Sequence, residues 1–174
     1  MYLNVKKLVL ASLFIAIEII TTRFLSIQTP IIRISLDFIP VALSAIILGP
    51  YTAGVTAAIA DIFGMMIFSR GGAYFPGFTL SAFVSGFLYG SILHKKRITL
   101  TRCFFAVLTV IISTSIVLNT IWLVIITNKG AFAILGARIV KDMLMMPIQT
   151  FLIYYVWRSV ESALKSTLIF NKTF

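Results

Sequence analysis

The sequence is poor in the residues that enzymes and metal proteins use for chemistry. Its 174 residues include one cysteine, Cys103, one histidine, His94, and only five acidic side chains. One cysteine cannot form an internal disulfide, and no group of cysteines and histidines has the spacing of a metal site. A P-loop of the form G-x-x-x-x-G-K-S/T is absent, as is a recognisable pair of nucleophile and base. We therefore predict no catalytic residue, no metal, no cofactor and no binding of ATP through a P-loop.

Charged side chains are also scarce. They make up 11% of the chain, whereas hydrophobic residues make up 60%, compared with about 25% and about 45–50% in soluble domains. The mean hydropathy is +1.06. A chain of this length cannot hide so much apolar surface in one core, so lipid must surround most of it. We predict an all-α, multi-pass protein of the cell membrane that forms a single domain over residues 1–174.

Six apolar segments are candidates for membrane helices, each of which needs about 20 mostly apolar residues to cross. The second segment is short, so the sequence leaves open whether it crosses fully, and Gly49-Pro50 after it predicts a tight turn. The first segment runs on to Arg23 without a small-residue cleavage site, so we interpret it as a helix and not as a signal peptide. The segments are 8–22, 35–48, 51–68, 78–93, 103–127 and 140–160.

The net charge of +10 comes from 15 lysines and arginines that lie in short segments between the apolar runs. Nucleic-acid-binding proteins instead carry basic stripes on a polar surface, so we expect no nucleic acid as a partner. Six spans put both termini on one side of the membrane. Nine of the cations fall on that side, including the cluster HKKR at 94–97, and six on the other. The positive-inside rule therefore predicts cytoplasmic termini.

Residues 70–79, RGGAYFPGFT, combine aromatic side chains with a constrained backbone on the predicted outer side. Glycine permits backbone conformations that other residues avoid, and Pro76 fixes one dihedral angle. This framing can hold Tyr74, Phe75 and Phe78 in defined positions, as in a lid or the wall of a binding site. Aromatic residues at a membrane interface can also be a simple belt, which needs no such framing.

Cations and polar groups accompany these rings on the same side. Arg23 ends the first span, Asn119 and Trp122 share a turn of the fifth, and Arg138 and Lys141 open the sixth. Rings supply stacking surface, and an arginine can bind a carboxylate through two hydrogen bonds. The combination favours a flat, aromatic, anionic ligand.

Ionisable groups inside membrane spans are costly and are therefore candidates for function. Arg138 and Asp142 are four residues apart, so a local ion pair between them is the simplest prediction. Glu18 and Asp61 each allow two interpretations. Either they neutralise neighbouring cations within the bundle, or they couple protons in a transporter that acts alone.

Several stretches together resemble the substrate-binding S components of energy-coupling factor (ECF) vitamin transporters, most of all the folate-specific ones. They are YFPGFTLSAFVSGFLYG at 74–90, the Gly-Pro turn, LNTIWL at 118–123 and ARIVKDMLMMPIQT at 137–150. The resemblance implies a six-helix bundle that captures a vitamin at the outer face and delivers it through a transmembrane T subunit and two ATPases. It also implies that the following residues form the binding site or its gate: Arg23, Phe75, Pro76, Gly77, Phe78, Asn119, Trp122, Arg138 and Lys141.

Two further positions follow from the resemblance. Ser12 and Ala16 match the A-x-x-x-A motif through which the first span of the family contacts the T subunit, and serine keeps that face small. Asp37 stands where a small residue is expected, and its carboxylate could bind the amino-pyrimidine edge of a pterin or could oppose an acidic tail. Folate is the leading expectation for the ligand. One alternative is that the ligand is another vitamin, such as pantothenate. The other is that the protein is a stand-alone secondary transporter.

Overall fold

The structure is a computed structural model of the chain and describes residues 5–28, 33–67, 75–127 and 131–170. Within these residues the chain forms six helical segments, one of which is the continuous helix Leu100–Thr127, and one small hairpin, so the predicted all-helical membrane bundle is confirmed with one addition. The elements are α1 (Val5–Arg23), β1 (Ser26–Gln28), β2 (Arg33–Ser35), α2 (Phe38–Leu48), α3 (Pro50–Ile67), α4 (Pro76–Leu93), α5 (Leu100–Val110), the π-helix η1 (Ile111–Leu118), α6 (Asn119–Thr127) and α7 (Ala131–Phe170).

Four helices of the described chain are long and apolar enough to cross a membrane: Pro50–Ile67, Pro76–Leu93, Leu100–Thr127 and Arg138–Ala163. The second apolar segment, residues 35–48, forms only the shorter helix α2. Its 11 helical residues rise about 1.5 Å each, or about 16 Å in all, which is roughly half of the hydrocarbon thickness. The helix α2 therefore does not cross the membrane by itself.

The connector between α1 and α2 is an antiparallel hairpin in which Ser26 pairs with Ser35 and Gln28 with Arg33. The sequence analysis did not predict these strands. In both, an isoleucine alternates with polar residues, a pattern that favours extended structure. The hairpin occupies the length that a longer second helix would have used.

Helices α3 and α4 pack at backbone distance. A Cβ at Gly86 would lie 2.6 Å from the carbonyl oxygen of Ala53, and a Cβ at Gly90 would overlap the backbone of Pro50. Small residues four apart thus allow the close approach that membrane helices use for packing. Beside this contact lies a core of large buried side chains that includes Tyr89, Leu93 and Val107.

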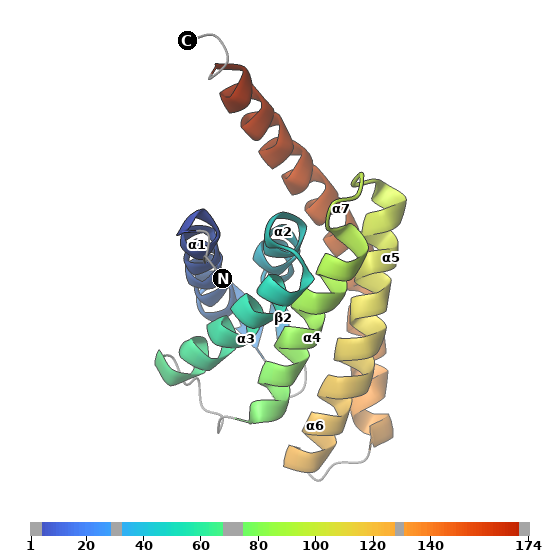
Figure 1. Cartoon of the computed structure of the whole chain (residues 1–174). Coiled ribbons are helices and arrows are strands. Elements are labelled where there is room, and N and C mark those ends of the chain that lie inside the picture. Colours follow the sequence, from blue (N-terminus) through green and yellow to red (C-terminus); the bar gives the residue numbers. More distant parts are fainter. Residues whose placement is uncertain (1–4, 29–32, 68–74, 128–130, 171–174) are drawn as a thin grey trace.

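The ends of the helices sort to two sides of the bundle. Figure 1 shows that α1 begins and α7 ends on one side of the bundle. On the other side, which we call the distal end, α3 and α6 end and α4 and α7 begin. Helix α7 has 40 residues with Pro147 inside it, and its last turns extend well past the other helices (Figure 1).

Candidate functional site

Three aromatic side chains, Phe75, Phe78 and Trp122, meet at the distal end and are called the aromatic cluster here. The ring centroids of Phe75 and Trp122 lie 5.6 Å apart, and those of Phe75 and Phe78 lie 6.1 Å apart. The indole Nε1 of Trp122 donates a hydrogen bond of 3.1 Å to Ser81 Oγ. The cluster thus joins the start of α4 to α6, and a hydrogen bond orients its largest ring.

The residue at position 77, which lies against the aromatic cluster, must be glycine. A Cβ at Gly77 would lie 2.5 Å from ring atoms of both Phe75 and Trp122, whereas carbon atoms prefer about 3.5–4.0 Å. Pro76 stands at the start of α4, where its missing N–H has no helical partner to lose. Tyr74, expected in the same set, lies outside the described residues.

The helix that carries Asn119 and Trp122 contains a wide turn that the sequence analysis did not predict. Residues Ile111–Leu118 wind as a π-helix between α5 and α6, and Thr120 Oγ1 donates to the carbonyl oxygen of Ser115, five residues back. Such π-helical turns occur frequently at functional sites. The one signal in the sequence is the run of three hydroxyl residues at 113–115 inside an otherwise apolar span.

Asn119 starts the α-helical turn that follows this π-helix. Its side-chain oxygen Oδ1 is buried and has no hydrogen-bond partner within the described part of the chain. A buried amide oxygen without a partner costs free energy. A ligand that donates a hydrogen bond to it would remove that cost.

Arg138 and Lys141 belong to a polar network between α7 and the π-helix. The hydroxyl of Ser115 donates to Asp142 Oδ2 at 2.6 Å and accepts a long hydrogen bond of 3.5 Å from Arg138 Nη2. Lys141 Nζ forms an ion pair with Asp142 Oδ1 at 2.6 Å. Arg138 is 8% exposed, and its Nε is buried without a hydrogen-bond partner among the described residues.

This network corrects the predicted ion pair between Arg138 and Asp142. Over the described residues the salt bridge of Asp142 is made with Lys141. Lys141 and Ser115 are the groups that contact the carboxylate, and Arg138 contacts Ser115, so its link to Asp142 runs through the serine hydroxyl. The guanidinium therefore keeps donor capacity for another group.

Arg23 is 4% exposed at the end of α1. A Cβ at Gly64 of α3 would lie 3.0 Å from Arg23 Nε, so the guanidinium lies against a helix surface that only glycine leaves open. Close by in sequence, Asp61 of α3 accepts a hydrogen bond of 2.8 Å from Thr79 Oγ1 of α4. This bond gives Asp61 a neutral hydrogen-bond partner inside the bundle.

The remaining predicted residues lie on the α1–α2 side. Asp37 is half-buried before α2, and its Oδ1 accepts a hydrogen bond of 2.6 Å from Ser35 Oγ. Glu18 is buried in α1. Ser12 and Ala16 are both exposed on α1, so their small face is not used for packing within the described bundle.

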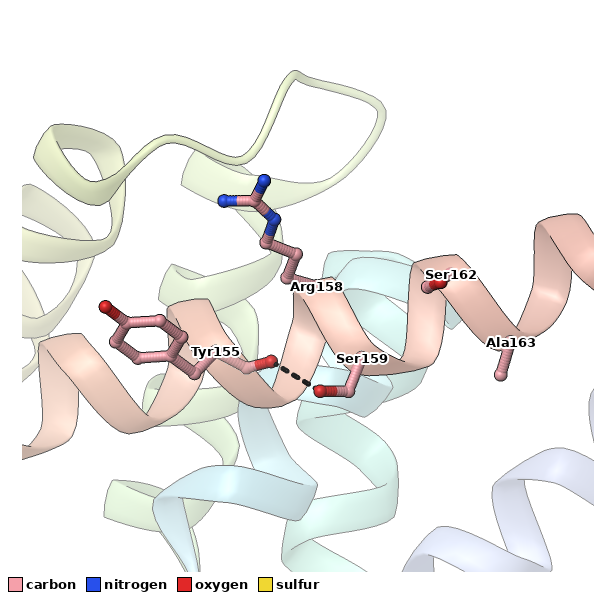
Figure 2. Close-up of a pocket in the computed structure, with 5 residues that line it drawn as sticks. All are labelled: Tyr155, Arg158, Ser159, Ser162 and Ala163. Atoms are coloured by element: carbon pink, nitrogen blue, oxygen red, sulfur yellow. Dashed lines mark hydrogen bonds between the residues drawn. The ribbon is translucent and has the colours of Figure 1, made fainter.

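A hollow on α7 lies far from the aromatic cluster. Arg158 on its wall is 20 residues from Arg138, which is about 30 Å along a helix. Figure 2 shows the lining residues on successive turns of this one helix, with the Arg158 guanidinium extending away from it. Without a second wall, the hollow has no means of enclosing a ligand. It is lined by Tyr155, Arg158, Ser159, Ser162 and Ala163.

The chain is similar to known proteins over most of its length. Residues 6–157 match the family model described as ECF transporter, substrate-specific component. The chain is 45% identical to the folate transporter FolT of Clostridium novyi (strain NT), with 91% of each chain covered. It is 30% identical to the folate transporter FolT of Leuconostoc mesenteroides subsp. mesenteroides, with 88% of this chain and 85% of that one covered.

Two solved structures share the fold. One is a crystal structure of FolT bound with folic acid, with a TM-score of 0.83 and 37% identity over 87% of this chain and 92% of that chain. The other is the S component of a bacterial ECF transporter, with a TM-score of 0.67 and 21% identity over 92% and 98%. The second likeness concerns the fold alone. The resemblance seen in the sequence is thus confirmed, and the chain belongs to the substrate-specific components of ECF transporters, which are transport proteins and not enzymes.

Proposed function

We propose that this chain binds folate at its distal end and that the distal end faces the outside of the cell. The observation that carries the proposal is the buried Arg138, whose Nε has no hydrogen-bond partner in the described structure. It lies on α7 against the same helical segment that carries Asn119 and Trp122. The relatives named as folate transporters, and the FolT structure bound with folic acid, support folate as the ligand.

Each group has a role that follows from its chemistry. The aromatic cluster offers ring faces on which a flat pterin stacks, and Gly77 and Pro76 shape the backbone beneath it. A carboxylate of the ligand accepts hydrogen bonds from Arg138, and Arg23 is the second candidate for this role. Burial makes such bonds strong, because a hydrogen bond is electrostatically stronger in the low dielectric of a protein interior than in water.

Asn119 and Asp37 supply hydrogen-bond acceptors, whereas the arginines supply donors. The Asn119 amide oxygen and the Asp37 carboxylate both accept hydrogen bonds, which the amino group and ring N–H of a pterin donate. The resemblance also placed Lys141 in the site, and we assign it to the edge of the site because Asp142 already holds its ammonium group. We expect no cofactor in addition to the ligand.

Transport needs energy that this sequence does not supply, since it lacks a P-loop. We propose that the chain associates with a membrane T subunit and two ATPases, and that Ser12 and Ala16 contact the T subunit. Both residues are exposed on α1, and small side chains allow a second helix to approach closely. In this arrangement the termini lie in the cytoplasm, in agreement with the excess of cations on their side.

Calorimetry on the purified full-length chain in detergent tests the ligand. We expect folate to bind with a Kd below about 1 μM, equivalent to more than about 8 kcal/mol, and pantothenate to give no heat. Tight binding of pantothenate without folate binding would assign the chain to another vitamin. Liposomes that contain this chain alone test the stand-alone transporter, because folate uptake without partner subunits would contradict the proposed assembly.

A further inference from the structure

We infer that Asp142 determines the charge that the site accepts: its carboxylate offsets one of the two positive charges of Lys141 and Arg138, so that their network keeps a net charge of +1. This inference rests on the proposed function, because it concerns the ligand of the same site. The geometry behind it is the ion pair of 2.6 Å between Lys141 Nζ and Asp142 Oδ1, with side chains 16% and 4% exposed. Lysine rarely faces the next residue along a helix, so its long side chain must fold back to reach the carboxylate.

Ser115 holds the carboxylate in this position. A hydroxyl has one hydrogen to donate, and here it is directed at Asp142 Oδ2 at 2.6 Å. The same oxygen then accepts from Arg138 Nη2 at 3.5 Å. Ser115 is therefore a positioning residue, since it anchors Asp142 and directs one edge of the guanidinium while Arg138 Nε keeps no partner in the described structure.

The charges of the network define a ligand class. Arg138 and Lys141 each carry one positive charge and Asp142 one negative charge, which leaves a net charge of +1. Such a site stabilises one carboxylate strongly. A second carboxylate gains little from Lys141, because Asp142 repels it at nearly the same distance. The distal end is in this way matched to a ligand that presents a single carboxylate to α7.

The test is the substitution Asp142→Asn, which keeps the shape of the side chain and an acceptor for Ser115 but releases the charge of Lys141. Pteroic acid, folic acid and pteroyldiglutamic acid, with one, two and three carboxylates, are titrated by calorimetry into the full chain. We expect the preference for folic acid over pteroic acid to rise at least about fivefold in the variant, because fivefold is the effect of one charge pair about 4 Å apart in bulk water and burial strengthens it. The preference should fall again as salt is added.

The double variant Lys141→Gln/Asp142→Asn is the matched control, because it restores the net charge of the network. We expect its ligand preference to return to that of the unmodified chain. A preference that stays unchanged in Asp142→Asn while folic acid still binds tightly would overturn the inference and leave the proposed function standing. Failure of all three pterins to bind the unmodified chain would overturn both.

A second measurement needs no ligand. Lys141 should react slowly with an amine-acylating reagent in the unmodified chain, because Asp142 holds its ammonium group, and faster in Asp142→Asn. Lys96, which is exposed outside the network, serves as the internal standard and should react equally in both. Peptide mass spectrometry gives the two rates. Equal labelling of Lys141 and Lys96 in the unmodified chain would overturn the inference.

Discussion

The substitution Gly77→Ala tests whether the close fit of the aromatic cluster supports ligand binding. The added Cβ would lie 2.5 Å from ring atoms of Phe75 and Trp122, although carbon contacts prefer about 3.5–4.0 Å. Both rings would therefore have to move by about 1 Å. Trp122 resists this movement because its indole is hydrogen-bonded to Ser81.

The magnitude follows from the cost of overpacking, which is about 1–3 kcal/mol for an added methyl group in a close-packed site. If the rings move away from their ligand-binding positions, folate affinity should fall by about 5- to 140-fold. Calorimetry on the purified chain measures this change directly. Thermal unfolding in the same detergent shows whether the helix bundle itself has been disturbed.

Gly136→Ala is a matched control for this experiment. Gly136 also lies in a helix at the distal end, but a Cβ there would meet no atom of the described structure within 4 Å. Alanine is also the better helix former, so affinity and thermal stability should be kept. An unchanged folate affinity in Gly77→Ala would refute the reasoning, because the cluster would then tolerate the displacement of its rings.

Three other substitutions address the ligand, the partner and the fold. Arg138→Gln should weaken folate binding, measured by calorimetry, by about 1.5–3 kcal/mol, the value of a hydrogen bond to a charged group. The control Arg158→Gln, toward the other end of α7, should leave the folate affinity unchanged. Equal folate affinities in the two variants would remove Arg138 from the site. Ala16→Leu should leave binding intact and abolish uptake in cells that carry the whole transporter, whereas loss of binding would mean that this face packs the bundle. Gly86→Ala should lower the thermal unfolding temperature, because the added Cβ would press against the Ala53 carbonyl and reduce the free energy of unfolding by about 1–3 kcal/mol. An unchanged unfolding temperature would contradict the close packing of α3 and α4.

The sequence by itself determined the class of this protein and the course of most helices. Hydrophobicity and segment length are properties of the chain in one dimension, and the bilayer converts them directly into spans. The close contact of α3 and α4 was predictable for a similar reason, because small residues four apart face the same side of a helix. The types of residue at the site were also visible in the sequence, since Arg138, Trp122 and Phe75 stand out among apolar neighbours.

The tertiary structure alone decided how these residues are partnered. Spacing along α7 predicts that Asp142 pairs with Arg138, yet the pairing depends on Ser115, which lies 27 residues away on another helix. The π-helix Ile111–Leu118 and the hairpin before the short α2 also became visible only in the tertiary structure. Local patterns describe one helix at a time, whereas the hydroxyl that anchors Asp142 comes from another helix and reaches it only through folding.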